Sequence, residues 1–235
     1  MQPVAVGARR RMVSIEAAAV AGLAFAVLSF ISVTLLTRLP DASDPAAIDA
    51  FYADSAERRL DFVALTLAQF AAITFLWFLA VIRRRIGDRE DRFFATVFYG
   101  SGLTYIAVML VGSAVLAGPS VAIDYGEGVP PGQDTYSLVV GIGWGIMLSV
   151  VPRVQAIFMI TTSTLIMRSG AIFKGVAILG YLIAAILIVV PILTRPSGVG
   201  LPVWVALTSI VLLFRRSEIR PPAPSTPATD PAGTG

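Results

Sequence analysis

The chain has 235 residues, of which 56% are hydrophobic and only 14% are charged. Soluble domains average about 45–50% apolar and about 25% charged residues, so the composition indicates that lipid surrounds much of the chain. The net charge of +3 is small, and its basic residues are clustered without interleaved aromatics, which argues against nucleic-acid binding. Cysteine and histidine are absent, which excludes disulfides, Cys/His zinc sites, histidine-ligated haem and histidine-based catalytic triads.

The first predicted span covers residues 13–37. Its apolar part, Ala17 to Leu36, follows arginines at positions 9–11 and is about long enough to cross a hydrocarbon core of about 30 Å. A cleaved signal peptide would have a shorter apolar core and a small-residue cleavage site, so we expect a retained helix. A twin-arginine export signal is the weaker alternative, because no Phe-Leu-Lys follows the arginines.

An acidic connection follows at residues 39–59. Asp44 and Pro45 are typical of a helix start, with Asp at the N-cap and Pro at the first helical position. Apolar or amphipathic side chains then recur at helical spacing on one face, at Ile48, Phe51 and Tyr52. We expect a short helix that lies on the outer interface or caps the bundle.

The second and third spans are predicted at residues 60–82 and 93–117. The second ends in an aromatic belt and a basic stop formed by Arg83, Arg84 and Arg85. These arginines could bind anionic lipid, although retention of positive charge on the inner side explains them without such a role. A Gly/Pro-rich loop is predicted for residues 118–136, because its Pro-Pro-Gly run cannot continue a helix.

The fourth span, residues 137–167, is the longest apolar run. At about 45 Å it exceeds a bilayer core, so it must tilt, kink at Pro152 or protrude from the outer face. The fifth and sixth spans are predicted at residues 175–193 and 197–214. The Pro/Ala/Thr-rich tail, residues 217–235, has no packable face and is expected to be disordered. Residues 1–216 are therefore predicted to form one all-α domain, a six-span transmembrane helix bundle.

The distribution of Lys and Arg predicts the topology. With the N-terminus inside, the outer segments hold only four basic residues, which are Arg38, Arg58, Arg59 and Arg195. Most of the acids also fall in the outer segments. The positive-inside rule then predicts that both termini are cytoplasmic in a multi-pass protein of the cell membrane.

Arg153 is the only basic residue inside an apolar segment. A charge near the membrane centre costs about 2.5–3.5 kcal/mol on insertion scales. One interpretation is an intramembrane site for an anionic substrate, a lipid head group or a counter-ion. The other is an ion pair that fixes packing, or an arginine that snorkels to the interface. Asp61 is the expected partner of Arg153, and Gln69 is the next candidate. Gln155 completes a possible intramembrane polar site. The helix dipole alone also explains an acidic residue at Asp61, in the first turn of the predicted span.

Small residues at Gly141, Gly145 and Ser149 recur at i, i+4 and i+8. In a membrane helix this spacing lets a neighbouring backbone approach closely, so we expect helix packing there. A nucleotide-binding glycine run is excluded because no strand precedes it. No catalytic, cofactor-binding or metal-ligating set is predicted.

Two segments carry a resemblance to known proteins. Residues 51–59 read Phe-Tyr-Ala-Asp-Ser-Ala-Glu-Arg-Arg, and residues 75–85 read Phe-Leu-Trp-Phe-Leu-Ala-Val-Ile-Arg-Arg-Arg. With the spans around them, they resemble a broad group of uncharacterised polytopic membrane proteins of high-GC Gram-positive bacteria. The resemblance implies a bacterial inner-membrane location and no particular activity.

Three function classes remain open. The first is a non-enzymatic scaffold or subunit of a membrane assembly, which predicts that Arg153 is packed and paired, with no cavity. The second is a small transporter or channel-like protein, which predicts a water-accessible cavity that reaches Arg153, possibly paired with Asp61. The third is a membrane enzyme acting on lipid, which predicts converging carboxylates under a lipid-sized cleft. The sequence leaves partner proteins and oligomeric state open.

Overall fold

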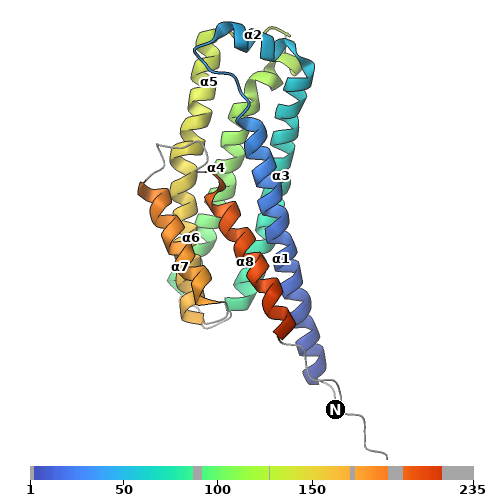
Figure 1. Cartoon of the computed structure of the whole chain (residues 1–235), viewed down its shortest axis with the longest axis vertical. Helices are drawn as coiled ribbons and strands as arrows, with labels where there is room; N and C mark the ends of the chain where they lie inside the picture. The colour runs from blue at the N-terminus through green and yellow to red at the C-terminus, as the bar shows by residue number, and fades with distance from the viewer. Residues whose placement is uncertain (1–2, 87–91, 127, 170–172, 190–197, 219–235) are drawn as a thin grey trace, which may run out of the picture.

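The computed structural model describes residues 3–86, 92–126, 128–169, 173–189 and 198–218. Within these ranges the regular structure is helical throughout, as the sequence predicts (Figure 1). The helices are α1 (Pro3–Leu36), α2 (Pro45–Ala53), α3 (Ser55–Ile86), α4 (Arg92–Tyr125), α5 (Gln133–Gly145), α6 (Val151–Ser169), α7 (Lys174–Val189) and α8 (Gly200–Glu218), with a π-helical turn, η1 (Ile146–Val150), joining α5 to α6.

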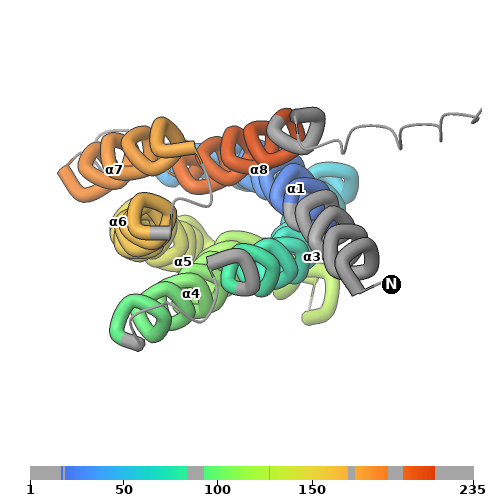
Figure 2. Tube along the Cα trace, turned by 90° about the horizontal axis from the view of Figure 1, so that it is seen from below, coloured from blue at the N-terminus to red at the C-terminus, as the bar shows by residue number. Residues whose placement is uncertain are grey.

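The long helices form an elongated bundle. Neighbouring pairs follow the order α1, α3, α4, α6, α7, α8 and back to α1, so each of these helices contacts two others in the ring. The end-on view shows α7, α8 and α1 in one row and α3 and α4 in a second, with α5 and α6 between α4 and α7 (Figure 2). Helix α2 lies across one end, while α1 starts and α8 ends at the other (Figure 1).

Four helical stretches are long and apolar enough to cross a membrane, and they are Ala19–Leu36, Ser55–Arg83, Phe93–Tyr125 and Gln133–Arg168. Helix α7 and the apolar part of α8, Gly200–Phe214, are also apolar but shorter. Large hydrophobic side chains such as Phe70, Trp77 and Ile186 are exposed on the outside of the bundle. An exposed apolar surface of this kind is compatible with a membrane protein.

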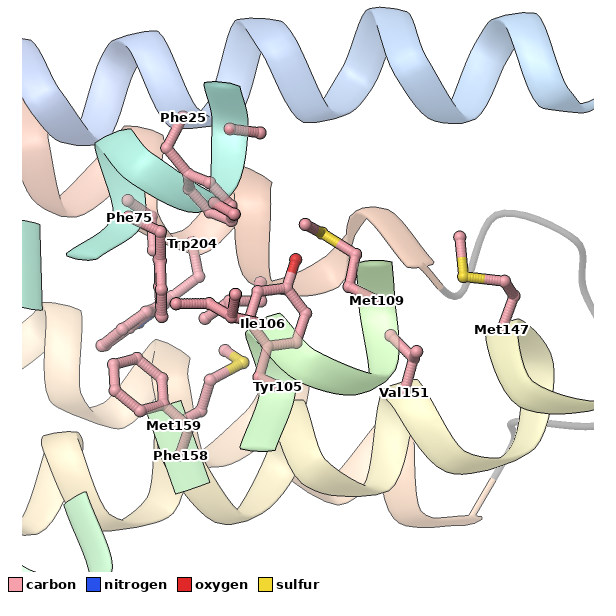
Figure 3. Close-up of a cluster of buried hydrophobic side chains, with 14 of the residues drawn as sticks. Phe25, Phe75, Tyr105, Ile106, Met109, Met147, Val151, Phe158, Met159 and Trp204 are labelled. Atoms are coloured by element: carbon pink, nitrogen blue, oxygen red, sulfur yellow. The ribbon is translucent and has the colours of Figure 1, made fainter. Parts of the chain in front are cut away.

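An aromatic cluster fills the centre of the bundle, where α1, α3, α4 and α6 meet (Figure 3). The Phe75 ring is central, with centroid distances of 4.8 Å to Phe25, 5.3 Å to Tyr105 and 5.2 Å to Phe158. Phe98 stacks on Phe158 at 5.3 Å. Aromatic pairs in tilted or edge-on arrangements at these distances add stabilisation to that from burying the rings. The cluster therefore stabilises the packing of the four helices against one another.

Two glycines allow close helix contacts. A Cβ at Gly22 of α1 would lie 2.1 Å from the Ser209 hydroxyl of α8, and one at Gly180 of α7 would lie 2.2 Å from the Ser163 hydroxyl of α6. The small residue therefore lets the two backbones approach, as is common in membrane bundles. The indole N–H of Trp204 also donates to the Val176 carbonyl at 3.0 Å, which joins α8 to α7.

The short helix predicted after Asp44 is confirmed. The Asp44 carboxylate accepts a hydrogen bond from the Ala47 amide at 3.0 Å, and Pro45 is the first residue of α2. Ile48 and Tyr52 are both buried beneath this helix. Helix α2 is therefore a cap whose apolar face seals one end of the bundle.

Several predicted boundaries differ from the structure. Helix α1 begins at Pro3, so the arginines at positions 9–11 belong to a helix and not to a tail. Helix α3 begins at Ser55, because the Asp54 carboxylate accepts from the Ala56 amide at 2.7 Å and starts the helix five residues early. Residues 190–193, predicted to end the fifth span, and tail residues 219–235 lie outside the described residues.

The loop predicted for residues 118–136 is wrong over most of its length. Helix α4 continues through Pro119 to Tyr125, and α5 already begins at Gln133. A proline removes one backbone donor, but neighbouring helices and hydroxyl side chains allow proline within membrane helices. Ser120 and Asp124, in the turns after Pro119, both bond to α3, which fixes the end of α4.

Candidate functional site

Arg153 lies in the first turn of α6, directly after Pro152, and its side chain is exposed. Its Nη1 donates to the Ser149 carbonyl and to the Ser149 hydroxyl, the latter at 2.7 Å. The expected pair with Asp61 does not form, since the ion pairs among the described residues join Arg38 to Glu57 and Arg58 to Asp124. Arg153 is therefore bonded within its own helix.

A π-helical turn lies beside the contact between Arg153 and Ser149. The Val151 amide bonds to the Ile146 carbonyl, five residues back, and Pro152 has no amide hydrogen to donate. A backbone carbonyl without a donor costs several kcal/mol in hydrocarbon, and the Arg153 guanidinium supplies a donor to one carbonyl of this turn. The kink at Pro152 stays a prediction, and the irregularity that the structure shows is the π-helical turn before it.

One face of α5–α6 points away from the bundle. Its exposed apolar residues are Leu138, Ile142, Val150 and Ile157. Gly141 and Gly145 belong to the same face, and a Cβ at either would meet nothing within 4 Å. They therefore pack against no described helix of this chain. The helix packing expected at these two glycines does not occur within the described part of the bundle. Gly143 packs instead, because a Cβ at this position would lie 2.6 Å from Leu116 of α4.

The outward surface of α5–α6 is given one name below. We call it the Arg153 face, and it consists of Leu138, Gly141, Ile142, Gly145, Ser149, Arg153 and Ile157.

Asp61 is enclosed between helices, with only 2% of its surface exposed. The Ser120 hydroxyl of α4 donates to its carboxyl group at 2.5 Å. This contact links the first turns of α3 to the last turns of α4. Sequence reasoning identified Asp61 but missed Ser120, because Ser120 lay in the segment predicted to be a loop.

A polar network surrounds Asp61 at the α2 end. Arg38 pairs with Glu57 at 2.6 Å, and Arg58 pairs with Asp124 at 2.7 Å. Arg58 also donates to the Tyr52 carbonyl at 2.5 Å. Burial raises the pKa of the Tyr52 hydroxyl above its ordinary value, and the nearby Tyr136 and Asp61 groups raise it further. The network ties α2 to the ends of α3 and α4.

The two glutamines lie in different environments. Gln155 is fully buried, and its Nε2 donates to the Gly198 carbonyl at 3.0 Å, which holds the start of α8 against α6. Gln69 is exposed on α3. The structure thus separates the four residues of the predicted polar site into an exposed Arg153, an exposed Gln69, a buried Asp61 and a buried Gln155.

A small cavity of about 10 Å³ lies beside η1. Its lining is mostly apolar and includes Ser29, Ser32, Tyr105 and Ser113 together with Met147. The Ser29 hydroxyl is buried and has no hydrogen-bond partner among the described residues. This volume holds about one water molecule, and neither Arg153 nor Asp61 lines it. Sequence reasoning missed this cavity because serines are common in membrane helices and mark no particular face.

The opposite end of the bundle carries cations against aromatic rings. The Arg83 guanidinium lies 4.5 Å from the Tyr99 ring centroid, and that of Arg168 lies 4.3 Å from the Phe94 ring. The side chains of Arg84 and Arg85 lie outside the described residues. Anionic lipid binding at this end stays a prediction. The described residues contain no group of three acidic, histidine or cysteine side chains that could hold a metal.

Comparison with protein families, with curated proteins and with solved structures gives no match. The arguments about function therefore rest on geometry. That geometry is a helical bundle with membrane-length apolar helices, a polar network at one end and an exposed cation on the Arg153 face.

Proposed function

We propose that this protein is a non-enzymatic subunit or scaffold of a larger assembly in the bacterial inner membrane. Within this chain Arg153 is not packed and paired as the scaffold class predicts, because it is exposed and contacts only its own helix among the described residues. The observation that supports an assembly best is this exposed cation on an outward apolar face, which a second chain would cover. A cation beside hydrocarbon is unfavourable unless neighbouring groups shelter it. An additional protein chain would give that shelter.

The proposed topology has six spans and two cytoplasmic termini. Helices α7 and α8 are apolar, so they fit as the two shorter spans. The start of α1 and the end of α8 lie at one end of the bundle (Figure 1), where Arg83, Arg168 and Lys174 are also found. The acidic network lies at the other end. The positive-inside rule then assigns the α8 end to the cytoplasm.

Transport is the second candidate function. A π-helical turn and a proline interrupt the longest span, and a small, mostly apolar cavity lies beside them. Transporters use interrupted helices of this kind around their binding sites. The cavity, however, holds about one water molecule and excludes Arg153. A membrane enzyme acting on lipid has less support. It would need converging carboxylates, but Glu57 and Asp124 each pair with an arginine and Asp61 bonds to Ser120.

Native mass spectrometry of the protein, extracted with its own membrane lipids, tests the proposal. We expect a defined complex in which this chain binds a second protein chain at fixed stoichiometry. The Arg153→Met variant should retain its fold and release that chain, whereas Gln69→Met, at another exposed position, should retain it.

Two results would contradict assembly. One is a mass spectrum in which the extracted protein binds only lipid, and no second protein chain, at every extraction condition. The other is a bound solute that exchanges across proteoliposomes, which would favour transport instead.

A further inference from the structure

We infer that Asp61 is a proton-binding site, which takes up a proton between mildly acidic and neutral pH, and that the bound proton holds α2 against the end of the bundle. The site lies between α3 and α4, beneath the cap that α2 forms. The inference goes beyond the proposed function and does not depend on it, because it rests only on groups inside this chain.

The first step is a buried acid without a cation. Only 2% of the Asp61 surface is exposed, and its carboxyl group accepts a hydrogen bond from the Ser120 hydroxyl. Among the described residues Asp61 forms no ion pair. A buried carboxylate is unfavourable unless a cation or a metal ion compensates its charge. A bound proton removes the charge and leaves the Ser120 contact intact.

The second step is the balance of charge around Asp61. Arg38 is bound to Glu57 and Arg58 to Asp124, so each of these pairs is neutral. Asp61 is therefore the unbalanced negative charge of the network when it is ionised. An acidic surrounding raises the local concentration of protons. The other acidic side chains of this end, set against the basic Arg59, are Asp41, Asp44, Asp49, Asp54 and Asp134.

The dipole of α3 does not supply the missing compensation. Helix α3 begins at Ser55, so Asp61 lies in its second turn. The effect of a helix dipole on a charge falls off within about the first turn. The explanation of Asp61 by the dipole assumed a span that starts at residue 60, and it loses its basis because the helix starts earlier.

A proton fits the site better than a metal ion does. Magnesium and calcium ions bind about six or more oxygen ligands. The described residues contain no group of three acidic, histidine or cysteine side chains that could hold a metal. A proton needs only one oxygen, which the Asp61 carboxyl group provides.

Tyr52 connects the charge on Asp61 to α2. The Tyr52 hydroxyl is buried and has no hydrogen-bond partner among the described residues, and Asp61 acts on it electrostatically. The hydroxyl of Tyr136, which also lies near Asp61, already donates to the Pro40 carbonyl at 2.7 Å. An ionised Asp61 therefore draws the Tyr52 hydroxyl towards it as a second donor, which disturbs the buried face of α2. The neutral acid leaves that face as it is.

Infrared spectroscopy of the full chain tests the proton site, because a protonated carboxyl group has its own carbonyl absorption. The chain is placed in vesicles of ether-linked phosphatidylcholine, which has no ester carbonyl, and the pH is lowered from alkaline to mildly acidic. We expect this absorption to appear while exposed carboxyl groups are still ionised, so that the proton binds more than about tenfold more tightly than to an exposed aspartate. Asp61→Asn should remove the absorption, whereas Asp49→Asn, at an exposed position of α2, should keep it.

Ser120→Ala distinguishes a proton site from a contact that only stabilises packing. A hydroxyl donates more strongly to a carboxylate than to a neutral acid. Loss of the Ser120 hydroxyl should therefore make Asp61 bind its proton about tenfold more tightly in the same infrared titration. An unchanged midpoint would contradict a titrating Asp61 that bonds to Ser120.

Amide hydrogen exchange tests the link to α2. Opening of α2 exposes Asp61 and releases its proton, so the protection of residues 45–53, corrected for the intrinsic exchange rate, should fall as the pH rises. The fall should be up to about tenfold per pH unit and should level off above the midpoint of the infrared titration. Asp61→Asn keeps an acceptor for Ser120 without a titrating group, so it should remove this dependence on pH.

Identical infrared spectra of the unsubstituted chain and of Asp61→Asn at every pH would overturn the inference. If Asp61→Asn does not fold, isotope-labelled aspartate in the unsubstituted chain takes its place, and an absorption that does not shift with the label has the same meaning. An absorption that sodium chloride abolishes at constant pH, while choline chloride does not, would assign the site to a metal ion instead of a proton. Equal dependence of α2 protection on pH in both chains would show that the proton does not hold α2.

Discussion

Asp61 and Arg153 are charged residues in apolar helices, and the fold places them in opposite environments. Asp61 is enclosed and bonded to Ser120, whereas Arg153 is exposed and bonded to Ser149. The sequence identified both residues as unusual. It did not predict their environments, because Ser120 and Ser149 were not recognised as their partners.

The Ser120–Asp61 contact predicts a stability effect. Ser120→Ala leaves a buried carboxyl group without its donor, which costs about 1–3 kcal/mol. The free energy of unfolding, measured by SDS titration in mixed micelles, should fall by this amount. Ser113→Ala is the matched control, because the Ser113 hydroxyl bonds only to the Met109 carbonyl of its own helix. A loss that is equal in both variants would show that the Asp61 contact adds no stability.

At the scale of elements, the predictable parts are those with local signals. Asp44 and Pro45 mark the start of α2 because capping depends on neighbours in the sequence. Pro119 misled the prediction, since packing against α3 keeps α4 helical beyond it. The π-helical turn before Pro152 depends on i→i−5 bonding, which has no simple residue signature. Helix starts that depend on neighbouring residues could be predicted from the sequence. Helix boundaries and irregular turns that depend on packing against other helices could not.

The cap on α2 gives a prediction at this scale. Asp44→Ala removes the acceptor for the Ala47 amide, and losing an N-cap costs about 1 kcal/mol. Amide hydrogen exchange in residues 45–53 should become about fivefold faster, while exchange in α6 stays the same. Asp49→Ala, at an exposed position within the same helix, should leave the exchange rates unchanged. Equal acceleration in both variants would contradict the role of the cap.

At the scale of the whole molecule, the sequence predicted the all-α class and the approximate positions of the long apolar helices. It could not predict which face of each helix packs inward. In water, the buried face of a helix is marked by its apolar residues, but in lipid both the core and the surroundings are apolar. Gly141 and Gly143 show this difficulty, because only Gly143 packs against α4 although both lie in one apolar run.

The central claim is that the Arg153 face is a surface for lipid or for another protein chain and does not line a water-filled path. Spin labels at single cysteines test it most directly, because the chain contains no cysteine of its own. Ile157 is 48% exposed on this face, and its neighbour Ala156 is fully buried. In vesicles, a label at Ile157→Cys should be mobile, accessible to oxygen and shielded from a water-soluble nickel chelate, whereas one at Ala156→Cys should be immobile and shielded from both. Strong relaxation of the Ile157→Cys label by the nickel chelate would contradict the account.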